Sequence, residues 1–345
     1  MKYITIKDIA RHLSISVSTV SRALGDDKNI RKETKEKVIE AAKRLGYRPN
    51  PVAINLKYGH TNTVGVIVPE MVTPFASRVI NGIQEVLHTK NIKVIIAESG
   101  GDPEKEKENL QLMEGFMVDG IIICLCSYKR NKEEYARLQQ AGMPMVFYDR
   151  IPYGLEVPQV IVDDYMKSFF LVESLIRSGR KQIVHIQGPD DIYNSIERVR
   201  GYKDALAKFG IPFDKNNMLI KTGMTFEEGK KAADILVERN IPFNAIFAFT
   251  ETLAIGAMNR LRELGKKIPE EIAVASFSGT ELSNIVYSRT AFVPDGEKSC
   301  RTYFRENQRS GISQSFNRVG CGNQNACIDA TFGGILMTYL PDIIS

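Results

Sequence analysis

Residues 5–24 read TIKDIARHLSISVSTVSRAL, and their pattern predicts the structure of the N-terminal part of the chain. Apolar residues recur in it at helical spacing twice, which predicts two short amphipathic helices. Ser16 is a favourable N-cap for the second helix, and Ser14 and Ile15 form the connection. Two short helices joined so closely are typical of a helix-turn-helix. The apolar positions are Ile6, Ile9, Ala10 and Leu13 in the first helix and Val20, Ala23 and Leu24 in the second.

A third helix is predicted from about Lys32 to Leu45, with Gly46 as its end. Three helices within about fifty residues can enclose a small core. Residues 1–48 are therefore predicted to form an all-α helix-turn-helix headpiece. The alternative that the residues leave open is a three-helix bundle with a solvated charged face.

The outward side chains of the second helix favour DNA binding over a plain bundle. Helix-turn-helix proteins place the start of this helix in the major groove, where short side chains meet base edges and Arg binds guanine through two hydrogen bonds. The candidates for base contacts are Val17, Ser18 and Arg22. Hydroxyl groups suited to phosphate contacts come from Thr5, Ser16, Thr19 and Ser21.

The composition is that of a folded protein with one basic end. A length of 345 residues favours two or three domains, and 43% hydrophobic with 25% charged residues excludes wholesale disorder. The net charge is +5, but residues 1–60 hold 13 Lys and Arg against 6 Asp and Glu, which leaves −2 for the remainder. We therefore expect the basic end to bind a polyanion, with nucleic acid as the first candidate.

The sequence also predicts where the protein works. No stretch approaches eighteen uninterrupted apolar residues, and the N-terminal MKYITIKDIA carries charges where a signal peptide would be apolar. The five cysteines define no disulfide framework. We expect a cytoplasmic protein in a reducing compartment, with no membrane partner.

Two segments together resemble a known family. SISVSTVSRAL (residues 14–24) followed by GYRPNPVAINL (residues 46–56) resembles the headpiece and hinge of the lactose-repressor (LacI/GalR) family of bacterial transcription regulators. That family usually has Gly where Ser14 stands and Arg where Ile54 stands, and a Ser at positive φ costs on the order of 1 kcal/mol. The resemblance covers residues 4 to about 287. It implies a sequence-specific repressor, acting as a homodimer on a near-palindromic operator in double-stranded DNA.

Residues 49–60 are predicted to form the hinge. Asn50 can cap a helix and Pro51 suits its first position, so about two helical turns are expected, although so short a helix is marginal alone. The resemblance implies that two hinge helices pair on the DNA, that Leu56 wedges into the minor groove, and that Asn50 and Ala53 lie in the same interface. A plain flexible linker is the alternative. We expect DNA and effector together to control the order of the hinge.

After Gly59, short apolar runs alternate with amphipathic helices, which is the pattern of βαβ units. The runs are too uniform for half-exposed strands, so they predict parallel sheets in two doubly wound α/β lobes. One series of strands ends near Asp163 and Asp164, which divides the lobes into residues 61–163 and 164–287. The resemblance implies the periplasmic-binding-protein-like effector domain of the same family. The predicted strands are TVGVIVP, KVIIAES, GIIIC, PMVFYD, QVIVDD, QIVHIQG, NAIFAFT and EIAVASFSG.

Ligands of such folds bind at the carboxyl ends of the strands, so candidate contacts follow strands. By its motifs the resemblance implies a small-molecule effector, a sugar or sugar derivative. Many members carry Asn and Asp where Thr250 and Glu251 stand and Asp where Ser278 stands, so the hydroxyl-binding pattern is expected to differ. Helix or loop caps remain the alternative for Asp149, Thr250 and Ser278, and a surface helix charge remains the alternative for Arg198. The candidate effector contacts are Phe75, Asp149, Arg198, Thr250 and Ser278.

The residues give no support to catalysis. Gly223 and Gly229 to Lys231 resemble a phosphate loop only loosely, and the four histidines have no metal-ligand spacing. His185 is expected in the core, and the neighbouring Asp163 and Asp164 are expected to act as caps. We predict no enzyme, no cofactor and no metal. The alternative function is a small-molecule (sugar) binding protein that does not bind DNA, which would need a signal peptide and no DNA-binding head.

Residues 288–345 break the βα pattern and hold three of the five cysteines. The family resemblance implies a closing helix and a closing strand here. Codons can be chosen for residues 300–307 that, read one base later, encode an amphipathic helix, Ala-Glu-Leu-Ile-Leu-Glu-Lys. The same shift, applied to codons that residues 317–327 permit, gives a strand-like Ile-Val-Leu-Asp-Ala-Glu-Ile-Lys-Met-Arg. We therefore predict an anomalous tail produced by a frameshift, with the closing elements of both lobes lost. A disordered tail is the alternative.

Overall fold

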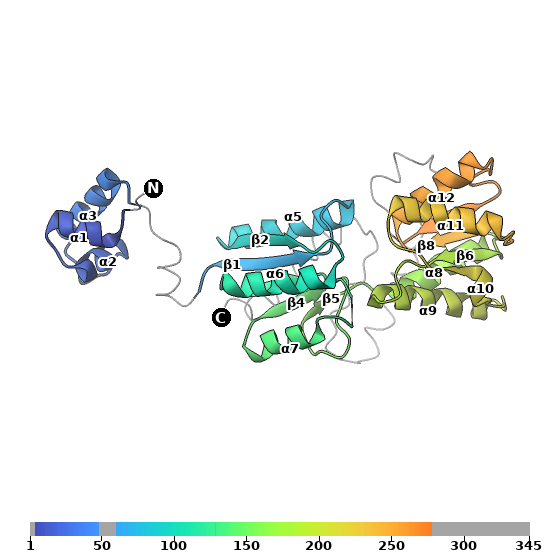
Figure 1. The fold of residues 1–345 in the computed structure, drawn as a ribbon, viewed down its shortest axis with the longest axis horizontal. Helices are drawn as coiled ribbons and strands as arrows, with labels where there is room; N and C mark the ends of the chain where they lie inside the picture. Colours follow the sequence, from blue (N-terminus) through green and yellow to red (C-terminus); the bar gives the residue numbers. More distant parts are fainter. Residues whose placement is uncertain (1–3, 48–59, 128, 278–345) are drawn as a thin grey trace, which may run out of the picture. The chain divides into compact units, whose positions relative to one another are not determined.

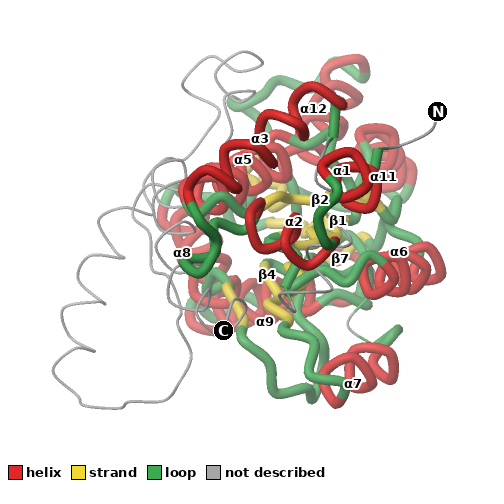
Figure 2. The backbone as a smooth tube through the Cα atoms, turned by 90° about the vertical axis from the view of Figure 1, so that its left-hand side faces the viewer, coloured by secondary structure: helices red, strands yellow, loops and turns green. Residues whose placement is uncertain are grey.

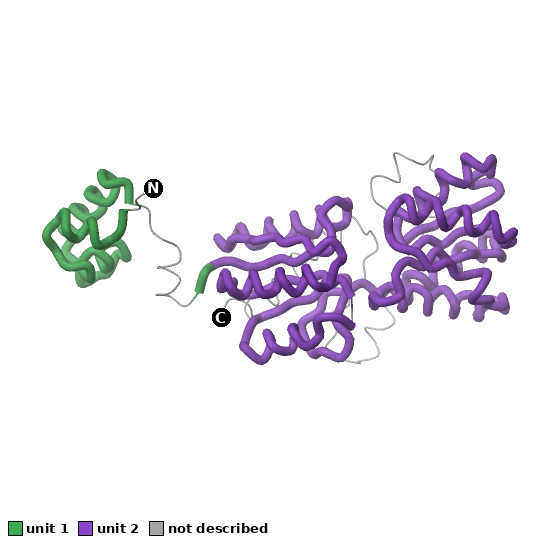
Figure 3. The backbone as a smooth tube through the Cα atoms, viewed as in Figure 1, with its two compact units in different colours: residues 1–61 green, residues 62–345 purple. Residues whose placement is uncertain are grey.

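The fold is described from a computed structural model that defines residues 4–47, 60–127 and 129–277. The chain divides into two compact units, residues 1–61 and residues 62–345 (Figure 3). The predictions for Asn50, Ala53, Leu56 and Ser278, and those for the tail at residues 288–345, lie outside the described residues.

The described part of the first unit contains three helices joined by short loops (Figure 2). They are α1 (Ile6–Leu13), α2 (Val17–Leu24) and α3 (Lys32–Leu45). All three contribute to one small core, whose fully buried members include Ile9, Val20 and Val38. The predicted helix-turn-helix headpiece is confirmed.

Local sequence explains where the three helices begin and end. The hydroxyl of Ser16 accepts a hydrogen bond of 3.0 Å from the backbone N–H of Thr19, which caps the first turn of α2. The turn before it begins at Ser14, which has a left-handed backbone with φ of 51°. Gly46 ends α3 in the same conformation, at φ of 70°. Glycine adopts this conformation without penalty, whereas serine does not.

The second unit begins with a lobe built on a parallel sheet. Its strands are β1 (Thr63–Val68), β2 (Lys93–Glu98), β3 (Gly120–Ile123), β4 (Met145–Tyr148) and β5 (Gln159–Val160), and its helices are α5 (Pro74–Thr89), α6 (Pro103–Gly115) and α7 (Lys132–Gln140). Among the described residues the strand order is β2-β1-β3-β4-β5 (Figure 1). Helix α5 packs on one face of the sheet, and α6 and α7 pack on the other. This is the doubly wound arrangement.

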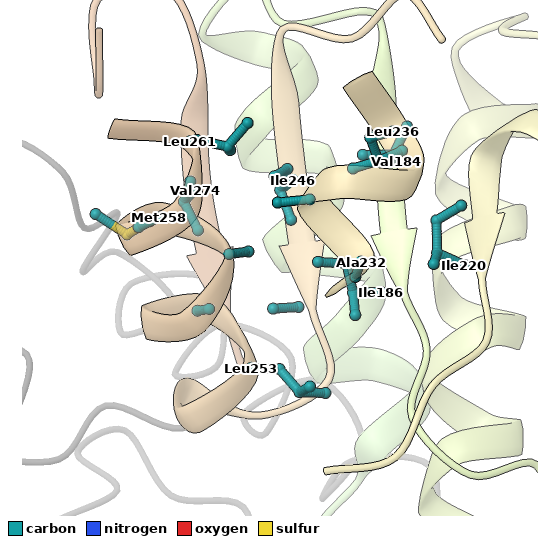
Figure 4. Packing of buried hydrophobic residues seen from close by; sticks show 14 of the residues in the cluster. Val184, Ile186, Ile220, Ala232, Leu236, Ile246, Leu253, Met258, Leu261 and Val274 are labelled. Carbon is teal, nitrogen blue, oxygen red and sulfur yellow. The ribbon is translucent and has the colours of Figure 1, made fainter. Parts of the chain in front are cut away.

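The second lobe is likewise a parallel sheet with helices on both faces. Its strands are β6 (Ile183–Ile186), β7 (Leu219–Ile220), β8 (Ala245–Ala248) and β9 (Ala273–Ser276), and its helices are α8 (Asp164–Arg177), α9 (Tyr193–Lys208), α10 (Lys215–Met218), α11 (Phe226–Glu238) and α12 (Glu251–Glu263). Where the chain is described, the order is β7-β6-β8-β9, all parallel. Helices α11 and α12 cover one face of this sheet (Figure 4), and α8 and α9 cover the other.

The predicted strands are present, but the extent of one and the existence of two further short elements were not predicted correctly. QVIVDD was expected to be a full strand, but only Gln159 and Val160 pair with β4. Asp163 instead caps α8, because its carboxylate accepts a hydrogen bond of 3.1 Å from the N–H of Met166. The short pair of β7 with β6 and the one-turn helix α10 were not predicted. Both lie in a stretch of mixed polarity, which has no clear period.

None of the helices in the described ranges has the length and apolar character needed to cross a membrane.

Candidate DNA interface and effector site

Helix α2 buries one face and leaves the other open to solvent. Val20 and Ala23 point into the headpiece core, with at most 2% of their surfaces exposed. On the opposite side Val17 is 38% exposed, although it is apolar, and Ser18 and Arg22 are exposed as well. The three residues predicted to contact bases therefore share the accessible face of α2.

Hydroxyl groups cluster at the start of this helix. The Oγ of Ser16 lies 2.8 Å from the Oγ of Ser18 and 2.8 Å from the Oγ1 of Thr19. At the start of α1 the hydroxyl and the N–H of Thr5 both donate to the Asp8 carboxylate, at 2.8 and 2.9 Å. The Thr5 hydroxyl must therefore leave Asp8 before it can donate to a phosphate. Ser21, the fourth predicted phosphate contact, is half-buried in the next turn of α2.

Arg22 is held only loosely in the headpiece. Its side chain is 62% exposed, and its Nε lies 4.0 Å from the Oδ2 of Asp27, which is beyond hydrogen-bond range. An exposed ion pair of this length contributes little to stability. The side chain can therefore be redirected to a ligand at small cost.

The carboxyl end of β4 makes a contact across the two lobes. Asp149 follows this strand in a left-handed conformation with φ of 57°, and its Oδ1 accepts a hydrogen bond of 3.3 Å from the Nδ2 of Asn194 in α9. The Sγ of Cys124, at the end of β3, lies 3.9 Å from the other carboxylate oxygen. The predicted contact Asp149 is thus joined to a residue of the other lobe that the sequence did not single out.

Arg198 is buried in the second lobe, where its guanidinium binds several neighbouring groups. Its Nε donates to the Oδ1 of Asp164 at 2.8 Å, and its Nη1 donates to the carbonyl of Phe249 at 2.6 Å. The guanidinium carbon lies 4.3 Å from the ring centroid of Phe249 and 3.5 Å from that of Phe277. Burial raises the pKa of Asp164 to about 6, although the nearby Arg198 acts in the opposite direction. The alternative of a surface helix charge for Arg198 was wrong.

Thr250 and Phe75 have structural roles of their own. Thr250 caps α12, because its Oγ1 accepts a hydrogen bond of 3.3 Å from the N–H of Leu253. Phe75 lies in the first turn of α5 and packs, half-buried, against the core of the first lobe. The cap weighed for Thr250 is therefore present, and effector contacts by either residue stay predictions.

His185 lies in the core, as expected. Its Nδ1 donates to the carbonyl of Phe247 at 2.8 Å, and its ring stacks on the ring of Phe247 at 4.2 Å between centroids. Burial lowers the pKa of His185 to about 3, so the ring is neutral at physiological pH. Its Nε2 has no hydrogen-bond partner among the described residues.

Known proteins that are similar to this chain identify its family. The family described as bacterial regulatory proteins, lacI family, matches residues 5–50, and the periplasmic binding proteins and sugar binding domain of the LacI family match residues 61–297. Catabolite control protein A of Priestia megaterium is 33% identical over 284 residues, which cover 82% of this chain and 85% of that protein. The chain belongs to the LacI family of bacterial transcription regulators.

Solved structures agree with this assignment. A transcriptional regulator CelR in complex with cellobiose is 27% identical, with a TM-score of 0.57, over 79% of this chain and 82% of that one. The lac repressor dimer bound to operator and the anti-inducer ONPF has a TM-score of 0.74 over 99% of this chain and 94% of that one. Because the identity to the latter is 19%, that likeness concerns the fold alone.

Membership of the LacI family settles the class of function. The chain is a DNA-binding repressor with a sugar-type effector domain, and the proteins similar to it are regulators rather than enzymes. The alternative of a binding protein without a DNA-binding head was wrong, since the headpiece is present.

Three polar residues near the predicted effector contacts were missed by sequence reasoning. Asp164 had been read as a cap, although it pairs with Arg198. Asn194 precedes Arg198 by four residues and so shares its face of α9, which was an available signal. Arg150 directly follows Asp149 and is buried, although its charge favoured an exposed position in a sequence reading.

Proposed function

We propose that this LacI-family chain acts as a homodimer that binds a near-palindromic operator and releases or retains it according to a polyhydroxylated small molecule held between its two lobes. The open face of α2, with Val17, Ser18 and Arg22 accessible together, is the observation that carries this proposal. Short side chains and one mobile Arg at the start of the second helix suit base edges in the major groove. Since its partner is chromosomal DNA, the repressor works in the cytoplasm.

Successive segments of the chain have different roles in this proposal. Residues 1–48 read DNA, residues 49–60 form the hinge, and residues 61–163 and 164–287 form the two lobes that hold the effector. Two-fold symmetry of a dimer matches the symmetry of a palindromic operator, and the lac repressor, which shares this fold, was solved as a dimer on its operator. In the hinge we assign Asn50 and Ala53 to the DNA interface and Leu56 to the minor groove, and we propose that ordering of the hinge couples the effector to DNA binding.

Two observations support a carbohydrate effector. The related regulator CelR was solved with cellobiose. In this chain the hydrogen bond between Asp149 and Asn194 joins the lobes through groups that suit hydroxyls, because a carboxylate accepts and an amide both donates and accepts. A ligand at this place would contact both lobes and so favour one of their arrangements.

The proposed frameshift concerns residues 288–345. A chain that lacks the closing helix and strand would leave sheet edges and apolar surface uncovered, which lowers stability and the response to effector. Resequencing the gene across the codons for residues 287–300 tests this directly. An added or missing base relative to the given sequence restores an ordinary full-length regulator, whereas confirmation of the given sequence means a genuinely altered chain in which only the DNA-binding head is expected to function.

The DNA-binding function is tested with two proteins. A fragment of residues 1–60 should bind DNA weakly and in a salt-dependent way, and residues 61–345 should not bind it. Leu56→Ala in the full chain should lower affinity for the operator well beyond its effect on random DNA. Equal losses on both DNAs contradict the proposed role of Leu56, and DNA binding by residues 61–345 alone contradicts the proposed function.

A further inference from the structure

Asp27 lies beside Arg22, the predicted base-reading arginine, in the loop that follows α2. Its Oδ2 is 4.0 Å from the Nε of Arg22, and its side chain is 31% exposed, half as much as that of Arg22. The backbone N–H of Asp27 donates to the carbonyl of Arg22 at 3.0 Å. The backbone therefore keeps the carboxylate of Asp27 next to the guanidinium of Arg22.

The loop that carries Asp27 is held at several points. The Oδ1 of Asp27 accepts two hydrogen bonds from Asn29, one from its backbone N–H at 2.9 Å and one from its Nδ2 at 3.0 Å. The N–H of Ile30 donates to the carbonyl of Asp27 at 3.1 Å, and the side chain of Ile30 packs against the headpiece core. One carboxylate oxygen of Asp27 is thus bound by the loop itself, and the other faces Arg22.

Asp27 is ionised at neutral pH. The backbone N–H of Asn29 is the main cause that lowers its pKa below the ordinary 3.8, and the charges of Arg22 and Lys35 act in the same direction. An ionised carboxylate only accepts hydrogen bonds, so the oxygen that faces Arg22 is an acceptor.

The neighbouring Asp26 is arranged differently. Its Oδ1 lies 2.7 Å from the Nζ of Lys35, which is a direct hydrogen-bonded ion pair. A cation held in this way has to give up a hydrogen bond before it can bind elsewhere. Arg22, at 4.0 Å from Asp27, has no such bond to break. Asp27 can therefore bias the direction of Arg22 without trapping it.

The nitrogen that lies nearest to the carboxylate determines what Asp27 can do for Arg22. It is Nε, at the inner edge of the guanidinium, so the two outer Nη groups stay available. Arginine binds a guanine edge through two parallel N–H groups. A carboxylate beside Nε thus restricts the orientation of the guanidinium plane and leaves two donors for the base. The same negative charge repels phosphate oxygens, which disfavours a contact of Arg22 with the DNA backbone.

We propose that Asp27 is a positioning residue for sequence recognition, whose carboxylate, anchored by Asn29, orients the guanidinium of Arg22 toward a base edge when the headpiece is on its operator. The inference rests on the proposed function, in which Arg22 contacts a base. Orientation by a fixed neighbour reduces the conformational freedom that Arg22 loses on binding. On random DNA the arginine meets no matching base, so Asp27 contributes only repulsion there. Asp27 should therefore increase discrimination rather than overall affinity.

Asp27→Asn separates the two contacts of this carboxylate. The amide oxygen can still accept from the N–H of Asn29, so the amide NH₂ then faces Arg22, where a donor cannot replace the accepting oxygen. Asp26→Asn is the matched control, because it removes an equal charge from the adjacent residue. Both side chains are exposed or half-exposed, so the melting temperature of the full chain should change little in either variant.

The experiment measures the affinity of the full chain for two duplexes. One carries the site that the wild-type chain enriches from a library of random sequences, and the other is a scrambled version of that site. Asp27→Asn should lower the ratio of the two affinities by about 5-fold. Asp26→Asn should raise both affinities by a similar factor of about 2 and leave their ratio unchanged. An unchanged ratio for Asp27→Asn, or an equal loss for Asp26→Asn, overturns the proposal.

A double-mutant cycle with Arg22→Ala shows whether Asp27 acts through Arg22. In the Arg22→Ala chain, Asp27→Asn should change the affinity ratio by less than about 2-fold. A loss of about 5-fold in that background would mean that Asp27 contacts the DNA itself, which also overturns the proposal. The selection tests the proposed function separately. If the wild-type chain enriches no site, the proposed function and this inference both fail, whereas an enriched site with an unchanged ratio refutes the inference alone.

Discussion

Arg198 and Asp164 form a buried ion pair of 2.8 Å whose side chains are 6% and 3% exposed. Asp164 is the first residue of α8, and Arg198 lies in α9 and also binds the carbonyl of Phe249 behind β8. The pair therefore ties the point where the chain enters the second lobe to the end of that lobe's sheet. Arg198 was predicted as an effector contact from its motif. In the structure its guanidinium has a structural role at the carboxyl edge of the second lobe's sheet.

Titration of Asp164 should be visible in the pH dependence of stability. Burial raises its pKa from an ordinary 3.8 to about 6, so between these values the folded protein binds a proton that the unfolded chain does not. The free energy of unfolding contributed by this group therefore falls as the pH rises from about 4 to about 6, and it is lowest above that range. The slope is to be measured by urea unfolding at pH 4.5, 5.5 and 7.

Asp164→Asn provides the control for that slope. The variant should lose the part of the pH dependence that falls between about pH 4 and 6, because asparagine does not titrate. A slope identical to that of wild type would assign the effect to other groups. At pH 7 the variant leaves Arg198 without a counter-charge, so its stability there is a separate question from its slope.

Close packing of α8 against α9 depends on one glycine. A Cβ at Gly201 would lie 2.3 Å from the carbonyl oxygen of Tyr165 and 2.9 Å from the N of Phe169, and both atoms are backbone. Gly201→Ala should therefore cost about 1–3 kcal/mol or more of unfolding free energy. Gly82→Ala in α5 meets nothing within 4 Å and should stabilise by up to about 1 kcal/mol. Equal effects of the two substitutions, measured by denaturant unfolding, contradict the packing argument.

The sequence predicted elements better than contacts. The helix from Lys32 to Leu45 was placed correctly because an apolar stripe and a terminal glycine both mark it. The alternation of apolar runs and amphipathic helices likewise predicted both lobes, since buried parallel strands are uniformly apolar. Strand β7 has two paired residues, and so short a run has no period that a sequence can show.

The candidate site was predicted only in outline. Strand ends locate Asp149 and Thr250, but they do not reveal that Asp149 binds Asn194 or that Thr250 caps α12. Such pairings depend on how the two lobes and their loops meet, which involves residues distant in the sequence. In the headpiece the sequence predicted the site residues more closely. The exposed face of α2 follows from the helical spacing of apolar residues within that one helix.

The left-handed turn in the headpiece offers a stability test. Ser14 adopts φ of 51°, so Ser14→Gly should stabilise the headpiece by about 0.5–1 kcal/mol. Gly46 ends α3 at φ of 70°, and Gly46→Ala should destabilise by about the same amount, since its strain comes from the backbone and nothing lies within 4 Å of the added Cβ. Thermal unfolding of the fragment of residues 1–60 compares the two. Stabilisation by Gly46→Ala would contradict the assigned backbone conformation.

Arg22 should carry sequence discrimination on the operator. It is exposed on the open face of α2 and loosely held by Asp27 at 4.0 Å, so it can bind a base edge at little cost to the headpiece. Arg22→Ala should weaken operator binding by about 10-fold or more and affect random DNA much less. Lys37→Ala removes an equal charge from an exposed position of α3 and should change binding to both DNAs by similar, smaller factors. Fluorescence anisotropy at two salt concentrations separates these effects. If Arg22→Ala weakens both DNAs equally, Arg22 contacts phosphates rather than bases.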